Sequence, residues 1–476
     1  MFARARSEED GPLNAVPLVG GVPSPSSALR AHRLRTIGLA GALLAVALVA
    51  LAAANMPHAA RGGAPARVQT QRHAASSYAV APSVLPELDS YGFPVLTDVL
   101  PKDGSRVVWG ICGPGRIAGD FTAALSAMGA KIGAVGAGSL PNALDRATDF
   151  ARLFRIPRAY GSYEELARDS SVQAVYIATT NNAHFANARL MLLHGKHVLL
   201  EKPATVGSAE FAQLVKLAAE RDLLFVTNFW TRFFPAIKWA KAVARSGLLG
   251  DVVHVQGDMA FQAVRVPGGD RFSLASLGGG AMLDMGCYLV QFAALFLPQP
   301  VGGNAPGDAR GFDVRALGQV EGGVDTDVAF VVAAGGASAS FGTSLRRSSN
   351  FALSIYCAHG KIEIDGPANC PVRASYALYD DAASKREPPV PCCGQPLLEQ
   401  RSFVQPLPTF PPRLLARRGY PNGMGFAYAA SAFERCLYTD GCRSLDELPT
   451  AEQQLIVDLT AEVFAHIGIY QNVSGM

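Results

Sequence analysis

The residue with the clearest chemical placement is Lys202. It follows the apolar run His197–Glu201, which predicts a short buried strand of a parallel sheet, and Pro203 comes directly after it. Proline ends the strand and keeps Lys202 out of helical geometry, so the ammonium group is presented at the carboxyl end of the strand. Open α/β sheets bind their ligands at that edge. The alternative is an ordinary surface lysine after a strand.

Asp284 and Tyr288 form a second candidate for chemistry. They stand four positions apart in an otherwise apolar stretch that follows the glycines 278–280. A helix here places both side chains on one face, one turn apart. Burying an unpaired carboxylate or phenol costs a few kcal/mol, so the pair indicates a catalytic role. The alternative is that Asp284 only lies in the first turn, where the helix dipole favours a negative charge.

A glycine-rich turn lies between an expected strand at 106–112 and an expected helix at 117–128. Its GxGxxA spacing is a form of the dinucleotide-binding fingerprint. Gly113 permits the tight turn, Gly115 lets the backbone approach a pyrophosphate, and the small Ala118 lets the helix pack on the strand. The amino terminus of the helix presents N–H groups to the phosphates. The residues of this turn expected at the cofactor are Gly113, Gly115, Arg116 and Ile117.

The end of the second expected strand, Lys131–Gly136, normally selects the cofactor. An acidic residue there binds the ribose of NAD, whereas an arginine binds the 2′-phosphate of NADP. Residues 137–139 are Ala, Gly and Ser, so the carboxylate that would repel a 2′-phosphate is missing and Ser139 can donate a hydrogen bond to it. This composition gives a weak preference for NADP, with NAD as the alternative.

Polar residues follow two further strands at the same sheet edge. The expected strand at 172–178 leads into a polar loop, and a helix starts at His184. For this histidine, the alternative to a ligand contact is a helix cap or a solvent-facing residue. The cofactor contacts expected from this loop and from the strand that ends at Lys202 are Thr179, Asn181, His184, Glu201 and Lys202.

An aromatic cluster opens the second half of the chain. The run from Trp230 to Pro235 holds three aromatic residues and one arginine at the expected mouth of the crevice. Such a cluster can form a wall for an apolar or ring-shaped substrate, or it can be interdomain core. The candidate substrate contacts are Trp230, Arg232 and Phe233, together with Asp284.

These residues must be positioned by the strands and amphipathic helices that alternate from residue 105 onward. The alternation predicts an α/β fold, with a Rossmann NAD(P)-binding domain over residues 105–228. We expect residues 229–476 to form a C-terminal substrate domain, to which the family resemblance given below adds a role in dimerisation. In it we expect a Pro- and Cys-rich irregular section, then helices near 426–438 and 450–468. Before that section, alternating patterns predict an antiparallel sheet at residues 325–333, 336–345, 352–357 and 360–364.

Composition narrows the class of protein. The chain has 476 residues, of which 49% are hydrophobic and 17% are charged, as in a globular protein with a large core. The net charge of +3 is small for this length and does not indicate binding to nucleic acid. The eight cysteines form no CxxC pair and no zinc spacing, so no metal site is expected. Cys436 and Cys442 are close enough to bond if the compartment is oxidising.

The amino-terminal region contains a candidate membrane segment. Residues 37–54 are uninterrupted apolar residues that span about 27 Å as a helix, close to the thickness of a bilayer core. We expect a disordered tail at 1–36, one transmembrane helix at 37–56 and a stem at 57–104. The alternative is a cleaved signal, which would make the protein secreted or luminal. A cytoplasmic amino terminus is favoured by the basic residues Arg30, His32, Arg33 and Arg35.

Three motifs together resemble the Gfo/Idh/MocA oxidoreductase family. They are the glycine turn, the Glu201-Lys202-Pro203 step, and the Gly-Gly-x-x-x-Asp-x-Gly-x-Tyr run at residues 279–288. Further stretches are similar to the family's subgroup of dimeric dihydrodiol and NADP-dependent D-xylose dehydrogenases. The stretches that carry this similarity are residues 160–167, 230–235, 249–251 and 422–426.

The resemblance implies a fold, a site and a reaction. The implied fold joins a Rossmann domain to an α/β domain whose open, mostly antiparallel sheet often forms a homodimer. Lys202, Asp284 and Tyr288 are implied to line the active site, with Trp230 beside the substrate. The implied reaction transfers a hydride to NAD(P) from a hydroxyl-bearing carbon of a trans-dihydrodiol or of an aldose such as D-xylose.

Two features leave alternatives open. The subgroup's arginines for the 2′-phosphate fall on Gly138 and Asn142 in this sequence, so the cofactor preference stays open. A rival function is a non-catalytic, membrane-tethered NADP(H)-binding sensor or scaffold. Such a protein would be expected to lose one of the three active-site residues, and all three are present.

The proton chemistry is expected at Tyr288. A free tyrosine has a pKa of about 10 and is a poor base at neutral pH. An ammonium ~4 Å away attracts a phenolate by about 4 kcal/mol at an effective dielectric of about 20, which would lower that pKa by up to roughly three units. We therefore expect Lys202 to activate Tyr288, and Asp284 to orient the substrate through a neighbouring hydroxyl.

Overall fold

The computed structural model describes residues 107–138, 141–263, 270–299, 311–379, 397–407 and 419–469. The expected tail, membrane helix and stem lie outside these ranges, and so does Ser139. Within the described part, the stretch Ala275–Phe296 is long and apolar enough to cross a membrane. Its most apolar window is 94% buried inside the protein, which is the burial of a core helix.

The first sheet has six parallel strands in the order β3-β2-β1-β4-β5-β6. Most residues of these strands are buried, which explains their continuous apolar runs. The strand order reverses between β1 and β4, and ligands bind outside the carboxyl ends of the strands at such a point. The strands are β1 (Val108–Cys112), β2 (Lys131–Gly136), β3 (Arg158–Tyr160), β4 (Ala174–Ile177), β5 (His197–Glu201) and β6 (Phe225–Asn228).

Helices connect these parallel strands, because a parallel pair needs a crossover. The start of α5 shows how local sequence sets a helix boundary. Ser162 Oγ accepts from the Glu165 backbone N–H, and the Glu165 carboxylate accepts from the Ser162 N–H, which is a capping box. The helices are α3 (Arg116–Ala127), α4 (Ala143–Phe154), α5 (Tyr163–Arg168), α6 (His184–Leu193) and α7 (Ser208–Glu220).

The second sheet has eight strands in the order β14-β13-β12-β11-β7-β10-β9-β8. Only the β7–β10 pair is parallel, so the expectation of a mostly antiparallel sheet is confirmed. The strands are β7 (Val252–Ala260), β8 (Asp313–Glu321), β9 (Val324–Ala334), β10 (Ala337–Ser344), β11 (Leu353–Cys357), β12 (Gly360–Ile364), β13 (Arg373–Tyr379) and β14 (Leu397–Val404).

The section after Ile364 was expected to be irregular, and that expectation is wrong for β13 and β14. β13 pairs with β12, and β14 adds to β13 as the edge strand. Neither β13 nor β14 contains a proline or a cysteine, so the residues that suggested irregular structure lie in the segments before, between and after these strands. β13 has the expected inward side chains, since Ala374 and Tyr376 are buried at alternate positions.

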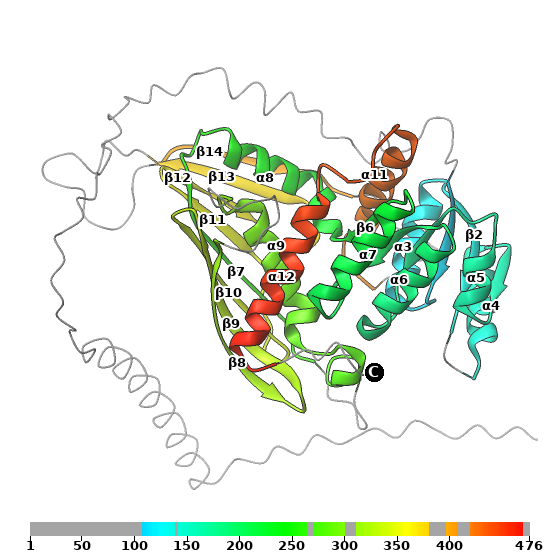
Figure 1. The fold of residues 1–476 in the computed structure, drawn as a ribbon. Helices are drawn as coiled ribbons and strands as arrows, with labels where there is room; N and C mark the ends of the chain where they lie inside the picture. Colours follow the sequence, from blue (N-terminus) through cyan, green and yellow to red (C-terminus); the bar gives the residue numbers. More distant parts are fainter. Residues whose placement is uncertain are drawn as a thin grey trace, which may run out of the picture. The chain divides into compact units, whose positions relative to one another are not determined.

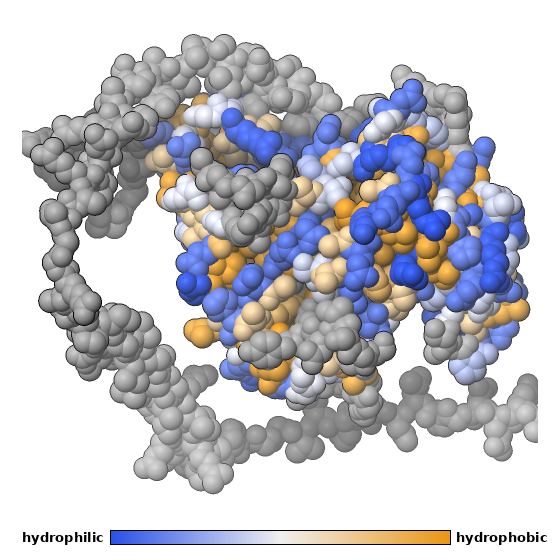
Figure 2. Space-filling view, in the orientation of Figure 1, coloured by the Kyte–Doolittle hydropathy of each residue, from blue (hydrophilic) through white to orange (hydrophobic). Residues whose placement is uncertain are grey.

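Helices α8 (Pro235–Arg245), α9 (Cys287–Phe296) and α12 (Thr450–His466) pack on one face of the second sheet (Figure 1). Side chains alternate across the sheet accordingly: Ile355 is fully buried, whereas the next residue, Tyr356, is 38% exposed. No helix of the described ranges covers the outward face. On the side of the molecule seen in Figure 2, hydrophobic residues lie in small groups between hydrophilic ones.

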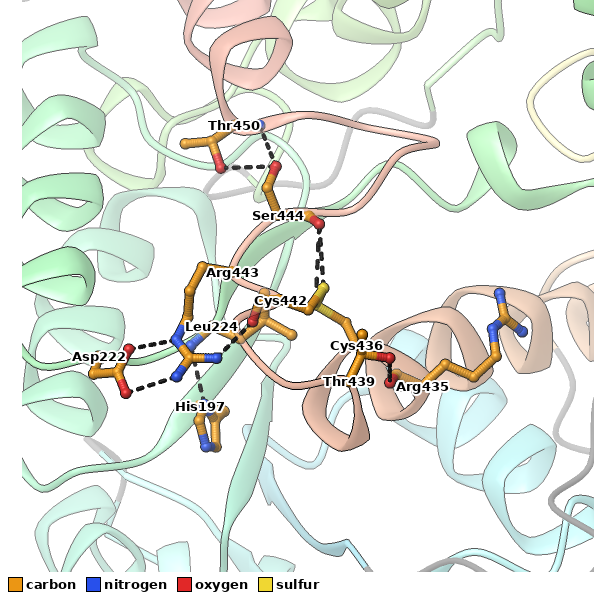
Figure 3. Close-up of a disulfide and its surroundings, with 10 residues drawn as sticks. All are labelled: His197, Asp222, Leu224, Arg435, Cys436, Thr439, Cys442, Arg443, Ser444 and Thr450. Atoms are coloured by element: carbon orange, nitrogen blue, oxygen red, sulfur yellow. Dashed lines mark hydrogen bonds and ion pairs between the residues drawn. A yellow bond between two sulfur atoms is a disulfide. The ribbon is translucent and has the colours of Figure 1, made fainter.

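A disulfide joins Cys436, in α11 (Phe426–Tyr438), to Cys442 in the loop that leads to α12 (Figure 3). The two Cα atoms are 5.3 Å apart, so the expected pairing is present in the structure. The next residue, Arg443, holds Asp222 with Nε and Nη2, at 2.5 and 2.6 Å from the two carboxylate oxygens. The loop is thereby tied to the residues just before β6.

Candidate active site

Lys202 follows directly on β5, at the carboxyl end of that strand. Its Nζ donates to the backbone carbonyl of Asp284 at 2.6 Å and lies 3.5 Å from Oδ1 of the same residue. The ammonium also lies 5.0 Å from the centre of the Tyr288 ring, over its face. The structure therefore brings the three expected catalytic residues together, although they come from two different domains.

Asp284 is ionised because two cations face its carboxylate. Arg271 Nη1 lies 2.9 Å from Oδ1, the oxygen that also faces Lys202. Burial raises the pKa of Asp284, but the charges of Lys202 and Arg271 outweigh burial, and the pKa is lowered. Burial in turn lowers the pKa of Lys202, and the charge of Asp284 outweighs that effect and leaves the pKa raised. A hydrogen-bond acceptor and a cation therefore stay side by side at neutral pH.

Tyr288 keeps its proton in this structure. Burial raises the pKa of Tyr288 well above its usual value, and the negative charge of Glu201 raises it further. A hydrogen bond of 3.1 Å that Trp230 Nε1 donates to the hydroxyl oxygen acts in the opposite direction and lowers the pKa. The expected net lowering of this pKa is not found, because burial and the charge of Glu201 raise it and the Lys202 ammonium donates its hydrogen bond to Asp284 and not to the phenol.

The turn that carries Asp284 is wider than the expected α-helix. Residues Met282–Gly286 form a π-helical turn (η4), and α9 begins only at Cys287. Single π turns occur often at functional sites. Asp325, from the start of β9, holds this turn: its Oδ2 accepts from the Met282 N–H at 2.7 Å, and its side chain is 1% exposed. Burial raises the pKa of Asp325 to about 6.

The glycine turn has the shape that a dinucleotide needs. Gly113 has a φ of +91°, and a Cβ there would lie 3.0 Å from the Ala178 carbonyl, so the position requires glycine. At Gly115 the nearest atom would be 3.9 Å away, which leaves space for a ligand. No side chain caps α3, and its first turn holds no acidic residue. The N–H groups of this helix end therefore fit the pyrophosphate of NAD(P).

The side chains of the same turn have other contacts. Arg116 Nη2 donates to the Gly419 carbonyl at 3.0 Å, and its guanidinium lies 5.5 Å from the centre of the Tyr420 ring. Ile117 is half-buried and packs against the core. In this structure the turn offers backbone N–H groups to a cofactor, and not the side chains of Arg116 and Ile117.

The expected cofactor residues after β4 hold the sheet edge together. Asn181 Nδ2 donates to the Gly278 carbonyl at 2.7 Å, which joins the loop to the second domain. His184 is 1% exposed, with Nδ1 2.7 Å from the Pro203 carbonyl and Nε2 3.2 Å from the Thr179 carbonyl. Burial lowers the pKa of His184 to about 4, so it is neutral. Through its contact with the Pro203 carbonyl, His184 supports the segment that carries Lys202.

Glu201 lies beneath the site. Its Oε1 accepts from the Tyr176 hydroxyl at 2.5 Å and from Asn228 Nδ2 at 2.8 Å, and its Oε2 accepts from the Lys202 N–H at 3.2 Å. Burial raises the pKa of Glu201. Through these three hydrogen bonds the Glu201 carboxylate links the ends of β4, β5 and β6. The contact of Glu201 with the cofactor that the sequence predicts is therefore not available in this structure.

Among the candidate substrate contacts in η2 (Trp230–Phe233), Trp230 alone bonds a catalytic side chain. Arg232 is 2% exposed, and its Nη1 and Nη2 donate to Glu452 Oε2 at 2.8 Å and to the Gln291 carbonyl at 3.0 Å. Phe233 is 1% exposed within the core. Side chains of a 3₁₀ turn point about 120° apart, so one faces the crevice and the others face the interior. In this structure Arg232 and Phe233 face the interior, so the contacts with substrate expected of them are not available here.

Three residues of the site were not singled out in the sequence: Arg271, Asp325 and Tyr420. Arg271 and Tyr420 lie in sections without periodicity, so no pattern marked them. Asp325 had a usable signal, because a carboxylate at an inward position of an alternating strand needs a partner. Within the described ranges, no group of three or more His, Cys, Asp and Glu side chains could hold a metal ion.

Family models match both domains. Residues 107–229 match the model described as "Oxidoreductase family, NAD-binding Rossmann fold", and residues 237–363 match the model of the GFO/IDH/MocA C-terminal domain. The family inferred from the three motifs is therefore confirmed.

Individual relatives agree with these models. Trans-1,2-dihydrobenzene-1,2-diol dehydrogenases of Sus scrofa and Homo sapiens are each 33% identical over 363 residues, which is 76% of this chain and 97% of the relative. A 3-ketoreductase mutant from Actinomadura kijaniata, solved with TDP-benzene and NADP, has a similar fold, with a TM-score of 0.59 and 20% identity over 76% of this chain and 98% of that one. The chain belongs to the Gfo/Idh/MocA family of oxidoreductases.

Proposed function

We propose that this chain is an NADP-preferring dehydrogenase that oxidises a hydroxyl-bearing carbon of a trans-dihydrodiol or of an aldose such as D-xylose. The observation that carries the proposal is the contact of Lys202 with both Asp284 and Tyr288 beside the glycine turn. The relatives named dihydrodiol dehydrogenase support this substrate class.

Each of the three side chains has a distinct task. The cofactor, when bound, supplies or accepts the hydride. Tyr288, which burial keeps protonated, donates its proton to the oxygen of a carbonyl substrate, and in the oxidation direction the same oxygen takes the proton back. Lys202 places a positive charge over the ring, where it stabilises a phenolate as it forms. Asp284 is ionised and accepts a hydrogen bond from a second substrate hydroxyl.

The preference for NADP rests on the end of β2. No carboxylate follows this strand, and Gly138 lies against the ring of Tyr163, where an added Cβ would be 2.8 Å from Cε2. A side chain at position 138 would therefore collide with this ring. We expect tighter binding of NADPH than of NADH, measured as quenching of protein fluorescence. Equal affinities would contradict the preference and leave the dehydrogenase proposal intact.

The test of the reaction uses the variants Lys202→Met and Tyr288→Phe. With D-xylose, D-glucose and trans-benzene dihydrodiol as substrates, each variant should lose about 10²–10⁴-fold in kcat, because each removes a group that handles charge in the transition state. Both variants should still bind NADPH. Lys216→Met is the control, since Lys216 is exposed at the surface of the first domain. Near-normal turnover in either active-site variant would refute the proposal.

We also propose that the protein forms a homodimer through the outward face of the second sheet. The support is that this face lacks a described helix and carries the half-exposed apolar side chains Val331 (41%) and Tyr356 (38%). Val331→Asp together with Tyr356→Asp should give a monomer in sedimentation equilibrium. Leu144→Asp is the control, because Leu144 is exposed on the first domain. A wild-type monomer would contradict this part of the proposal.

Finally, we propose that residues 37–56 anchor the protein in a membrane with a cytoplasmic amino terminus, so that the catalytic domains face the opposite compartment. The Cys436–Cys442 disulfide supports this topology, because disulfides persist in oxidising compartments. In sealed vesicles, residues after 57 should be protected from added protease, and the protein should stay in the membrane pellet after a carbonate wash. Release by carbonate would favour the secreted or luminal alternative.

A further inference from the structure

Tyr420 lies among the residues of the candidate active site, although it comes from the C-terminal segment that follows the second sheet. Its ring makes an edge contact with Trp230, with ring centres 6.3 Å apart, and it lies 5.5 Å from the Arg116 guanidinium. The charges of Lys202 and Asp284 act on its hydroxyl, and burial raises its pKa, so it is a neutral phenol. Its position is therefore at the crevice and not in the core of either domain.

The backbone around Tyr420 is tied to the cofactor helix. The buried carboxylate of Asp120, in α3, accepts from the Gly419 N–H at 2.9 and 3.0 Å and from the Tyr420 N–H at 3.0 Å. The segment packs closely on these side chains, since a Cβ at position 419 would lie 2.5 Å from Arg116 Nε and 3.0 Å from Asp120 Oδ2. The segment is thus held at both its N–H and its carbonyl groups, which fixes the ring of Tyr420 in place.

The Tyr420 hydroxyl has no hydrogen-bond partner among the described residues, although its ring is half-buried. This differs from the other phenol of the site, since Tyr288 accepts a bond from Trp230. A fixed phenol with an unused donor and acceptor at the crevice is suited to a polar group of the substrate. The hydroxyls of a simple diol are already matched: one by Tyr288 and the other by Asp284.

We propose that Tyr420 is a specificity-determining residue whose hydroxyl binds a third hydroxyl of the substrate, so that the site selects polyhydroxylated sugars over simple diols. This inference rests on the proposed dehydrogenase function and narrows its substrate class. Asp120 is a positioning residue, because it acts only through the segment that carries Tyr420.

The test is Tyr420→Phe, which removes one oxygen and keeps the ring. For D-xylose, kcat/KM should fall about 10-fold, the value expected for one lost hydrogen bond, mainly through a higher KM. For trans-benzene dihydrodiol, which has no third hydroxyl, kcat/KM should stay within about two-fold. Asp120→Ala should reproduce this selectivity change once thermal unfolding shows that the variant is folded. Tyr428→Phe is the control, because this tyrosine lies in α11 and is 5% exposed.

Two other sets of results would contradict, respectively, the role of Tyr420 and the proposed dehydrogenase function. An equal loss on both substrates, or no loss on either, would show that the hydroxyl does not select the substrate and would overturn the role of Tyr420, while the dehydrogenase function stands. Wild-type protein that turns over neither D-xylose nor the dihydrodiol would overturn the proposed function, and the role of Tyr420 with it.

Discussion

Trp230 Nε1 donates a hydrogen bond to the hydroxyl oxygen of Tyr288 at 3.1 Å. The bond occupies one lone pair of the phenol and leaves its single proton free to point elsewhere. The bond also lowers the pKa of this tyrosine, against burial and the charge of Glu201, which raise it. The aromatic residue expected to contact substrate therefore acts on Tyr288, the proton donor of the proposed mechanism.

The first prediction concerns Trp230→Phe, which removes the N–H but keeps an aromatic ring to stack on Phe426, whose ring centre lies 3.9 Å away. The pKa of Tyr288 should rise, because the lost bond favoured the phenolate, and the alkaline limb of the pH–rate profile for reduction of the carbonyl substrate, where Tyr288 is the proton donor, should move to higher pH. We expect kcat to fall about 10-fold, as for one hydrogen bond. Trp239→Phe, remote from the site, is the control. An unchanged pH profile would contradict the role of the bond.

The second prediction separates structure from substrate binding at Arg232. Arg232→Met leaves the Glu452 carboxylate and the Gln291 carbonyl without their buried donor. Breaking such a buried pair should lower the free energy of unfolding by about 3–5 kcal/mol, measured in urea, with little change in KM for the folded fraction. A higher KM at unchanged stability would mean that Arg232 binds substrate after all.

Much of the fold follows from local patterns in the sequence. The strand Lys131–Gly136 and the helix Phe426–Tyr438 have the bounds that periodicity predicted, because apolar runs, glycines and caps mark their ends. β13 and β14 did not follow from local pattern. β13 pairs with β12 and β14 pairs with β13, and β14 has only exposed and half-buried residues, so its sequence carries little hydrophobic alternation.

The site was predictable to the extent that each residue belonged to a motif. Lys202, Asp284 and Tyr288 were marked by type and spacing, and they come together. The sequence could not show that Met282–Gly286 is a π turn, since that depends on Asp325 from another element. It also could not show that the lysine bonds Asp284 instead of the phenol, because a hydrogen-bond partner is chosen by tertiary geometry.

The third prediction is a pH dependence of stability that arises from Asp325. Its pKa is raised from 3.8 to about 6 in the folded protein, so the folded state binds the proton more tightly than the unfolded state. The contribution of Asp325 to the free energy of unfolding is therefore largest below pH ~4, where the carboxyl is protonated in both states. This contribution, about 3 kcal/mol, is lost as the pH rises through about 6. Asp325→Asn cannot ionise but keeps an acceptor for the Met282 N–H.

Urea unfolding of both proteins at several pH values measures this effect. The free energy of unfolding of the wild type should fall relative to Asp325→Asn between pH ~4 and ~6.5 and then stay level. Asp313→Asn, at a largely exposed carboxylate, is the control and should follow the wild type. If the free energies of unfolding of the wild type and of Asp325→Asn differed by the same amount at every pH, the pKa of Asp325 would not be raised.

The fourth prediction concerns the disulfide. Cys436 and Cys442 are six positions apart, and closing so short a loop is worth about 2 kcal/mol of unfolding free energy in the chain-entropy model. Cys442→Ser should lose that amount in urea unfolding. A reducing agent should destabilise the wild type to the same level and leave the variant unchanged. If the reducing agent lowered the free energy of unfolding of both proteins equally, it would be acting at a site other than this disulfide. Because the loop also carries the Arg443–Asp222 pair, its release should increase backbone amide exchange just before β6.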